Sequence, residues 1–337
     1  MKIVITKLLT ADKFNAALKA PKDVIDILNL PEHLIKIYDS STKNKFKKVI
    51  RHFKIFPQLF KFRKGEFYIF QYPVSYLKCN EINISNIKNY ILLLHDIASL
   101  RNQKKTKGER KLFDNAKIII SHNQVMTDYL ISQGIDSNKI VNLELFDYLC
   151  DEVEYKNKDI ANGLTIAYAG NIDKALFIKQ LDSSKMNFEM NLYGVKSDNL
   201  QINDKLHYIG KETPEKLPNL IDANLGLVWD GNIDSSDESD ILKNYTKYNN
   251  PHKVSCYLAA GIPVIVWSKS AIWNFVRDNN CGYAIDNIYD INNLDLSNYE
   301  EKRKNAIEIS KKVRSGYYTK KAFNTAFEKL GLEERIK

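Results

Sequence analysis

Short apolar runs alternate along the chain with stretches in which apolar positions recur at helical spacing. Several of these runs, including Tyr90–Leu94 and Lys117–Ser121, are apolar on both faces, which is typical of strands buried in a parallel sheet. Their alternation with amphipathic segments predicts βαβ units. The predicted strands are Lys2–Thr6, Leu34–Tyr38, Phe67–Tyr72, Tyr90–Leu94, Lys117–Ser121 and Ile140–Leu145 in the first half, and Thr165–Ala169, Glu189–Tyr193, Leu206–Ile209, Leu225–Trp229, Ile262–Trp267 and Tyr283–Ile285 in the second.

The strand pattern divides the chain into two halves. Six predicted strands in each half indicate two Rossmann-like, doubly wound α/β domains that face each other across a cleft. We place the first domain at residues 1–155 and the second at 160–315, because the polar segment from Cys150 to Gly163 has no periodicity. The tail, about residues 316–337, is predicted to be a helix that packs back on the first domain. Its apolar face would consist of Phe323, Ala326, Phe327 and Leu330.

The composition indicates a globular chain. Apolar residues occupy 44% of the 337 positions, and no apolar run is long enough to predict a transmembrane helix. The first residues predict a strand interrupted by Lys7, not a signal peptide. The four cysteines lie far apart and form no CxxC pair, which indicates reduced thiols rather than disulfides or a zinc site. We therefore expect a cytoplasmic protein.

Positive charge is in excess and is unevenly distributed. The chain has 50 Lys and Arg against 41 Asp and Glu, a net charge of +9, which favours an anionic partner. The segment Lys43–Lys64 holds nine of these basic residues and no acidic one. Its apolar residues leave two interpretations open: a solvated helix face, or a helix that docks on an acceptor or on the inner face of the membrane. No nucleic-acid-binding module accompanies the charge, so nucleic acid is not expected as a partner.

The strongest local signal for a binding site is the segment Tyr248–Trp267, YNNPHKVSCYLAAGIPVIVW. Asn250 suits the N-cap and Pro251 the first turn, so a helix is predicted from Pro251 to Ala260, ended by the glycine that follows. The first turn of a helix is a good anion site, whereas Lys253 alone is unfavourable there because it meets the positive end of the helix dipole. A bound anion would resolve that conflict. The alternative is a solvated lysine on an ordinary capped helix.

A second signal for phosphate binding is the sequence YAGNIDK. Gly170 and Asn171 follow a predicted strand and would make a tight turn into a helix, which brings phosphates close to backbone N–H groups. Lys174 would add charge to the same pocket. The GxGxxG pattern is absent, which disfavours a nicotinamide-dependent dehydrogenase. Since a single glycine after a strand is common, an ordinary turn remains the alternative.

Polar residues also follow strands in the first half. His95 and Asp96 come directly after the strand Tyr90–Leu94. Asp96 is interpreted either as a general base, with His95 or Arg101 as positioning groups, or as the N-cap of the next helix.

Two further strand ends carry weaker signals. Ser121, His122 and Asn123 follow the next strand, where an N-cap and a surface histidine are the favoured interpretation. Tyr193 and Trp229 end strands in the second half and could stack on a base, although packing is favoured for both.

Signals for a metal centre or an activated nucleophile are missing. The six histidines are scattered without an HxxxH pair or a His/Cys cluster, and the sequence contains neither a P-loop nor a GxSxG elbow. We expect no metal ion and no cofactor.

Together, these segments resemble a family of bacterial sugar transferases. The segment Tyr248–Trp267, the following SAIWNFVRDNNCGYAI, and the shorter YAGNI, HDI and FQYP are similar to those of adhesin-glycosylating enzymes related to glucosyltransferase 3. Enzymes known as β-1,6-galactofuranosyltransferases share the pattern. The resemblance spans most of the chain, is most specific at Tyr248–Trp267 and is weakest before Leu30.

The resemblance implies the GT-B fold. The second domain would hold a UDP-sugar donor, which is a substrate, and the first would hold a glycan, glycolipid or glycoprotein acceptor. By the same carry-over, the UDP site would be lined by Gly170, Asn171, Tyr248, Asn249, Asn250, Pro251, His252 and Lys253. Lys174 and Tyr193 join this set because of their positions near strand ends.

The stereochemistry follows from a comparison with retaining GT-B enzymes, many of which carry Glu-x7-Glu ahead of an AAGxPVI segment. Those two positions fall here on Tyr248 and Cys256, so inversion is expected. Inversion needs a base to deprotonate the acceptor hydroxyl, which favours Asp96 with His95 beside it. The helix terminus and Lys253 would stabilise the leaving UDP without a metal.

The transferred group is expected to be a hexose, with glucose first and galactofuranose next. Two alternatives remain: a non-catalytic partner that binds glycans or glycoproteins beside an active transferase, and a UDP-sugar epimerase on the same fold. The acceptor and the oligomeric state, including a homo-oligomer, stay open.

Overall fold

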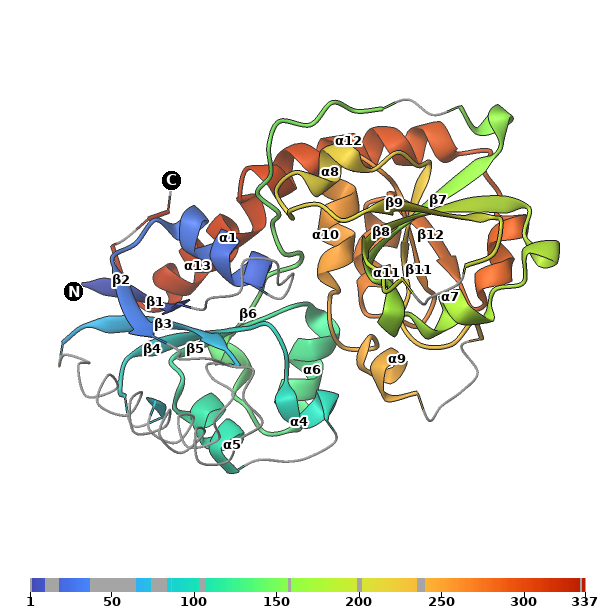
Figure 1. Ribbon diagram of the computed structural model, residues 1–337. Helices are drawn as coiled ribbons and strands as arrows, with labels where there is room; N and C mark the ends of the chain where they lie inside the picture. Colours follow the sequence, from blue (N-terminus) through green and yellow to red (C-terminus); the bar gives the residue numbers. More distant parts are fainter. Residues whose placement is uncertain are drawn as a thin grey trace. The chain divides into compact units, whose positions relative to one another are not determined.

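The computed structural model describes residues 2–9, 18–36, 65–73, 84–85, 87–102, 107–156, 159–198, 202–234, 240–333 and 335–336. The chain forms two compact units: unit 1 comprises Met1–Leu143 and Thr319–Lys337, and unit 2 comprises Glu144–Tyr318 (Figure 1). Each unit contains a six-stranded sheet whose paired strands all run parallel. The predicted fold class of two Rossmann-like α/β units is therefore confirmed.

Unit 1 has the strand order β2-β1-β3-β4-β5-β6. Strands β3, β4 and β5 are buried along their whole length, as their continuous apolar runs predict. Its strands are β1 (Ile3–Leu9), β2 (Glu32–Lys36), β3 (Phe67–Tyr72), β4 (Tyr90–Leu94), β5 (Ile118–Ser121) and β6 (Ile140–Asn142). Up to β6, its helices within the described residues are α1 (Lys19–Leu28), α4 (Ala98–Arg101), α5 (Lys107–Asn115) and α6 (Gln124–Ser132), with η2 (Ser137–Lys139) before β6.

Unit 2 has the strand order β12-β11-β10-β7-β8-β9. Its strands are β7 (Leu164–Asn171), β8 (Phe188–Val195), β9 (Leu206–Gly210), β10 (Leu225–Val228), β11 (Val264–Trp267) and β12 (Gly282–Ile285). Its α-helices are α7 (Leu176–Gln180), α8 (Leu217–Leu220), α9 (Ile241–Tyr245), α10 (His252–Ala259), α11 (Ile272–Asp278) and α12 (Tyr299–Arg314). Short 3₁₀ turns are η3 (Ile160–Asn162), η4 (Ile172–Lys174), η5 (Ser183–Lys185) and η6 (Ile288–Asn293).

The order of strands in unit 2 places a topological switch point between β7 and β10. The chain runs from β7 outward to β8 and β9, and then returns to the other side of β7 as β10. In open α/β sheets, ligands bind in the crevice at the carboxyl ends of the two strands that flank this point. The carboxyl ends of β7 and β10 are therefore the first place to look for a site.

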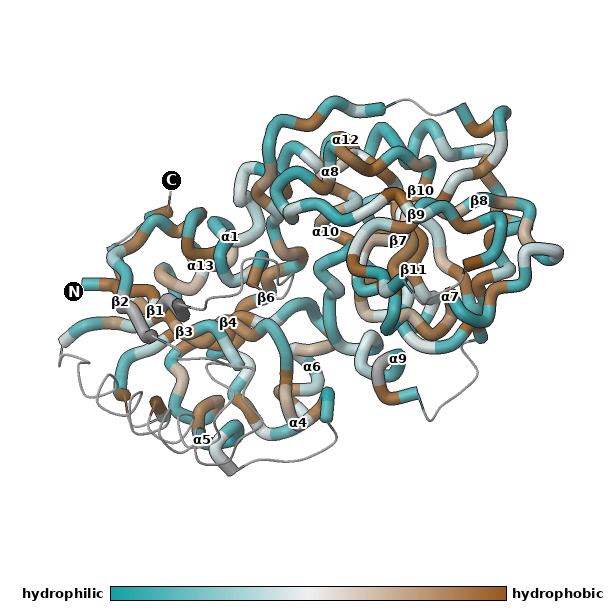
Figure 2. Tube along the Cα trace, viewed as in Figure 1, coloured by the Kyte–Doolittle hydropathy of each residue, from teal (hydrophilic) through white to brown (hydrophobic). Residues whose placement is uncertain are grey.

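Apolar side chains fill each unit from the strands outward. Figure 2 shows brown, hydrophobic stretches running through the strands of both sheets. In unit 2, helix α10 buries six consecutive residues, Val254, Ser255, Cys256, Tyr257, Leu258 and Ala259, against one face of the sheet and against α12. Such burial on all sides fixes the helix rigidly relative to β7 and β10.

All twelve predicted strands are present; Phe67–Tyr72 and Tyr90–Leu94 have the predicted ends, and the others are shifted at one or both ends. Strand β1 continues through Lys7, and β2 begins at Glu32 rather than at Leu34. Strand β7 includes Gly170 and Asn171, which pair with Gly194 and Val195 of β8. The predicted tight turn at Gly170 is therefore wrong, because the ladder with β8 keeps both residues extended.

The chain enters unit 2 earlier than the predicted linker at Cys150–Gly163. Three hydrogen bonds hold the preceding segment, Glu144–Tyr148, within unit 2. The Asn250 amide donates to the Glu144 carbonyl (2.7 Å), the Ser255 hydroxyl donates to the Phe146 carbonyl (2.6 Å), and the Tyr148 N–H donates to the Val313 carbonyl (3.0 Å). We call Glu144–Tyr148 the strap.

The tail forms helix α13 (Tyr317–Lys329), and the chain from Thr319 onward clusters with unit 1. Phe323, Ala326 and Phe327 are buried, as the predicted apolar face requires. The Lys329 ammonium donates to the Ile140 carbonyl at 3.2 Å.

Three further expectations concern the cysteines, the basic segment and membrane-spanning helices, and the structure describes only part of the residues involved. Cys150, Cys256 and Cys281 are free thiols, and Cys79 lies outside the described residues. The basic segment Lys43–Lys64 also lies outside them. Within the described ranges, no helix has both the length and the apolar character needed to cross a membrane.

Candidate functional site

Helix α10 starts one residue later than predicted and without the predicted cap. Pro251 is the N-cap, it makes no side-chain capping bond, and the helix begins at His252. The Asn250 side chain binds the strap carbonyl of Glu144 instead, a residue with the positive φ of 72°. The prediction of an Asn250 cap is therefore wrong, because the Glu144 carbonyl of the strap takes that amide. Gly261 ends the helix with φ 72°, as predicted.

His252 also faces the strap. Its ring lies 5.0 Å from the ring of Tyr148 between centroids, and its Nε2 lies 3.4 Å from the Asp147 carbonyl oxygen. Its neighbour Asn249 has a buried Oδ1 that accepts no hydrogen bond from the described part of the chain. The Oδ1 of Asn249 is thus an acceptor suited to a ligand, whereas the ring of His252 contacts the strap.

Lys253 reaches the switch point between β7 and β10. Its ammonium lies 3.2 Å from the Tyr168 hydroxyl of β7 and 3.3 Å from the Trp229 carbonyl that follows β10. It also pairs with the Asp230 carboxylate at 3.0 Å, and its side chain is 20% exposed. In this structure, the Asp230 carboxylate is therefore the anion that pairs with Lys253 at the start of α10.

These contacts keep Lys253 charged. Burial acts to lower the pKa of Lys253, but the Asp230 carboxylate and the Tyr168 oxygen outweigh it, so the pKa is raised above its usual value. Burial raises the pKa of Tyr168, which remains a neutral hydroxyl. The switch point therefore carries a fixed, partly exposed cation.

One glycine, Gly170, lies beside the Lys253 side chain. A Cβ added to Gly170 would lie 3.3 Å from Cε of Lys253. Gly194, the partner of Gly170 in β8, has φ 135°, and a Cβ there would lie 1.8 Å from the Gly170 carbonyl oxygen. The backbone of β7 therefore excludes a side chain at Gly194, whereas the neighbour of Gly170 is the flexible end of the Lys253 side chain.

Two other predicted site residues lie near the end of β7. Asn171 caps η4 by accepting from the Lys174 N–H at 3.1 Å. Both side chains are exposed. Their positions near the carboxyl end of β7 leave them close in sequence to the switch point, without a described contact to Lys253.

The two aromatic candidates are packing residues. Tyr193 is buried, and its hydroxyl accepts from the Asp222 N–H at 2.9 Å. Trp229 is buried as well, and its indole N–H donates to the Asn232 carbonyl at 2.7 Å. Both side chains have the packing role that the sequence favoured, and a contact of Tyr193 with the donor stays a prediction.

A small pocket that the sequence did not indicate lies at the carboxyl ends of β10 and β11. The buried ammonium of Lys243, in α9, lies 4.1 Å from the ring centroid of Trp229 and 5.1 Å from that of Trp267. Since these residues are far apart in sequence, only the fold brings them together. The pocket is lined by Val228, Trp229, Asp230, Lys243, Thr246, Pro251, Trp267, Ser270 and Ile272.

In unit 1, Asp96 does not cap the helix that follows it. The N-cap of α4 is Ile97, without a side-chain bond, and the buried Glu109 carboxylate accepts from the Ser99 N–H at 3.1 Å. Asp96 instead pairs with Arg101 at 2.5 Å, and both side chains are accessible to solvent. The capping interpretation of Asp96 is therefore wrong.

A glutamine that the sequence did not indicate orients His95. The Gln71 amide nitrogen donates to the Pro21 carbonyl at 3.0 Å, which fixes the direction of the amide, since a carbonyl only accepts. Its oxygen therefore faces the His95 Nε2 at 2.7 Å. The Nε2 must carry the proton of the neutral ring, so the lone pair of His95 lies on Nδ1.

His122 is buried rather than exposed. Its Nε2 lies 3.0 Å from the Leu94 carbonyl oxygen, and burial lowers the pKa of His122 to about 4. The predicted surface position is wrong, because the ring is buried against the carboxyl end of β4. Asn123 does cap α6 as predicted, accepting from the Met126 N–H at 2.9 Å.

No group of three or more His, Cys, Asp or Glu side chains in the described ranges is arranged to hold a metal ion. Metal independence is a separate question and stays a prediction.

Family models cover nearly the whole chain. Residues 2–145 match the N-terminal domain, and residues 166–326 the C-terminal domain, of the glucosyltransferase 3-like proteins. The chain is 31% identical over 325 residues to the β-1,6-galactofuranosyltransferase WbbI of Escherichia coli (strain K12), covering 92% of this chain and 94% of that protein. It is 24% identical over 271 residues to glucosyltransferase 3 of Streptococcus gordonii, covering 76% of this chain and 78% of that protein.

Solved structures with the same fold include sugar transferases. Sucrose-phosphate synthase from Thermosynechococcus elongatus matches with a TM-score of 0.65 and 12% identity, covering 98% of this chain and 99% of that one. HepE from Anabaena, solved in complex with UDP, matches with a TM-score of 0.57 and 11% identity, covering 98% and 100% of the two chains. At this identity, the likeness concerns the fold.

Proposed function

Because this chain belongs to the glucosyltransferase 3-like family and is a glycosyltransferase of the GT-B fold, we propose that it transfers a hexose from a UDP-sugar with inversion of configuration. The acceptor is a cell-surface glycan or glycoprotein. Glucose leads when the motifs alone are considered. The higher identity to a galactofuranosyltransferase makes galactofuranose an equal candidate.

The observation that carries this proposal is the position of Lys253. A cation fixed at the switch point of a doubly wound sheet, in the first turn of an α-helix, is where the diphosphate of a nucleotide sugar binds well. The donor phosphates would take the place of the Asp230 carboxylate as the partner of Lys253. Their negative charge rises as the bond to the sugar breaks, so the same contact stabilises the leaving UDP.

Three residues of the proposed donor site support the proposal most directly. Lys253, Gly170 and Asn249 have atoms suited to a ligand, since they offer a cation, bare backbone and a buried acceptor. Tyr248, Pro251, Asn171 and Lys174 remain proposed contacts. Asn250 and His252 would act through the strap, because their side chains are engaged there.

The chemical step follows from this arrangement. The acceptor hydroxyl attacks the anomeric carbon as the bond to the UDP oxygen breaks, and UDP leaves with that electron pair. Asp96 is the proposed base that takes the hydroxyl proton. His95, the residue before it, has its lone pair on Nδ1. No metal is required, because Lys253 and the helix terminus carry the charge of the diphosphate.

A donor screen tests the proposal directly. UDP-glucose and UDP-galactofuranose would be offered with a mixed glycan acceptor, and release of UDP and the anomeric configuration of the product would be measured. We expect acceptor-dependent UDP release and an inverted linkage. UDP binding without turnover would favour the non-catalytic partner, and conversion of the donor without an acceptor would favour the epimerase.

A further inference from the structure

The hydrogen-bond ladder between β7 and β10 is interrupted by a side chain. The two strands pair through Ile166 with Leu225 and through Ala167 with Gly226. In that register, the next rung would join the Ala169 N–H to the Leu227 carbonyl. The hydroxyl of Tyr257 occupies this rung instead: it accepts from the Ala169 N–H at 2.7 Å and donates to the Leu227 carbonyl at 3.1 Å.

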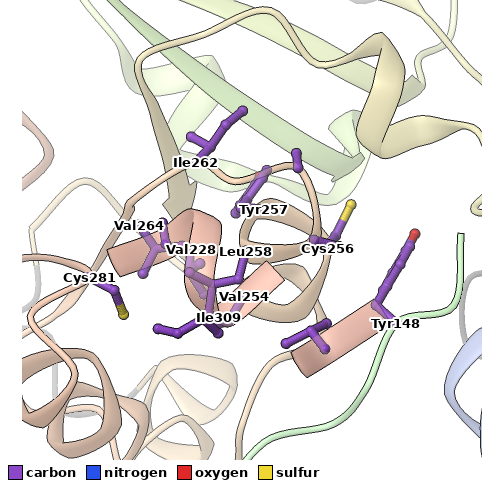
Figure 3. Packing of buried hydrophobic residues seen from close by; sticks show 14 of the residues in the cluster. Tyr148, Val228, Val254, Cys256, Tyr257, Leu258, Ile262, Val264, Cys281 and Ile309 are labelled. Atoms are coloured by element: carbon purple, nitrogen blue, oxygen red, sulfur yellow. The ribbon is translucent and has the colours of Figure 1, made fainter. Parts of the chain in front are cut away.

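The ring of Tyr257 is held tightly in this position. It is fully buried within the cluster of apolar residues drawn in Figure 3. It also lies directly on Gly226 of β10, where an added Cβ would approach its Cγ to 2.3 Å. The hydroxyl therefore cannot swing out of the rung while the ring keeps its place. Because burial raises the pKa of Tyr257 well above its usual value, the hydroxyl stays protonated and can donate.

Tyr257 and Lys253 act on the same crevice. They are four residues apart on α10, so they project from one face of the helix, one turn apart. Lys253 spans the opening between the Tyr168 hydroxyl of β7 and the Trp229 carbonyl after β10. Tyr257 bridges the same two strands at Ala169 and Leu227, and Leu227 lies two residues before the Trp229 carbonyl that Lys253 contacts.

We propose that Tyr257 is a positioning residue whose hydroxyl wedges β7 and β10 apart by one rung and so sets the width of the crevice that Lys253 spans. This inference rests on the proposed role of Lys253 in holding the donor diphosphate. Without the hydroxyl, the Ala169 N–H and the Leu227 carbonyl can bond directly, which draws the two strand ends together. The partners of Lys253 then shift, and the ammonium no longer meets the diphosphate in the same place.

The test is a mutant cycle read by calorimetric titration with UDP. The proteins are wild type, Tyr257→Phe, Lys253→Ala and the double variant. We expect Tyr257→Phe to weaken UDP binding about tenfold, and the double variant to bind no more weakly than Lys253→Ala alone, because both act through one contact. A residue that only fills the core would add its effect to that of Lys253→Ala or leave UDP affinity unchanged.

The matched control is Tyr299→Phe. This tyrosine is also buried, and its hydroxyl donates at 3.3 Å to the carbonyl of Asn224, just before the amino end of β10. Tyr299→Phe removes a hydrogen bond at the opposite end of β10, so UDP affinity should stay at the wild-type value. Should Tyr257→Phe fail to fold, Gly226→Ala displaces the same ring without removing the hydroxyl, and it should weaken UDP binding in the same coupled way.

Two outcomes separate this inference from the proposed function. If wild type does not bind UDP, the proposed function fails, and the wedge is judged by the structure of Tyr257→Phe. A direct bond from Ala169 to Leu227 supports the wedge, and an unchanged gap overturns it. If wild type binds UDP and Tyr257→Phe binds it equally well, the hydroxyl merely satisfies two buried backbone groups.

Discussion

The two units have similar parallel sheets but present different polar groups at the carboxyl ends of their strands. In unit 2, Lys253 is held by three partners, two of which, Trp229 and Asp230, follow one strand. In unit 1, Asp96 pairs with the exposed Arg101, and exposed ion pairs contribute little energy. The difference suggests a preformed anion site in unit 2 and a carboxylate in unit 1 that exchanges its partner easily for a substrate.

The sharpest way to break this comparison is Asp96→Asn. The change keeps the shape of the side chain and removes the proton acceptor, so turnover should fall about 10²–10⁴-fold, the usual share of general-base catalysis. UDP affinity should hardly change, because Asp96 belongs to the other unit. Initial rates and UDP titration measure the two effects separately.

The matched control is Asp114→Asn, which alters another exposed Asp–Arg pair of unit 1, Asp114 with Arg110 at 2.8 Å. This control should keep wild-type turnover. Wild-type turnover in Asp96→Asn as well would show that the base lies elsewhere. Collapse of UDP affinity in a folded Asp96→Asn would contradict the division of substrates between the units.

A second prediction concerns how the free energy of unfolding depends on pH through His122, which contacts the carbonyl of Leu94 just before His95 and Asp96. The pKa of the buried His122 is about 4 in the folded protein, below the value of about 6.5 for an unfolded chain. As the pH falls below about 6.5, the unfolded chain therefore gains a proton that the folded chain refuses. This contribution is complete above pH 6.5, is lost between about pH 6.5 and 4, and amounts to about 3 kcal/mol.

Denaturant unfolding between pH 7 and 4 measures this loss. His122→Gln retains a group that can donate to the Leu94 carbonyl but does not titrate. The variant should lose less stability than wild type over the same interval. Parallel curves for the two proteins would mean that His122 is protonated in the folded state.

The anion site of unit 2 is probed by Lys253→Ala. Hydrogen bonds to charged groups contribute about 1.5–3 kcal/mol, so UDP affinity should fall about 10- to 150-fold. Lys304→Ala removes the same charge from an exposed position of α12 and should have no such effect. Calorimetry that finds equal UDP affinity in folded Lys253→Ala and wild type would remove Lys253 from the donor site.

The smallest expected effect is that of chelation. If Lys253 and the helix terminus stabilise the diphosphate, activity should survive excess EDTA. Initial rates with and without EDTA measure this, and an inactive metal-depleted enzyme that recovers on addition of Mg²⁺ or Mn²⁺ would contradict the proposal.

Much of the fold follows from local sequence patterns. The buried strands Phe67–Tyr72 and Tyr90–Leu94 were predicted with their observed ends, since long apolar runs with turn residues on either side leave few other structures open. The end of α10 at Gly261 and the Asn123 cap were also predicted, because both depend on a few neighbouring residues. These features are settled within one or two turns of chain.

The grouping of the site was decided by tertiary structure alone. Lys253 meets Tyr168 and Asp230, which lie 85 and 23 positions away, and no local pattern indicates such contacts. The same holds for Asn250, a suitable cap by its position, which binds the strap 106 positions earlier instead. A carbonyl that loses water on folding is satisfied by whichever donor the fold brings near, so the packing of distant segments, not local propensity, assigns these side chains.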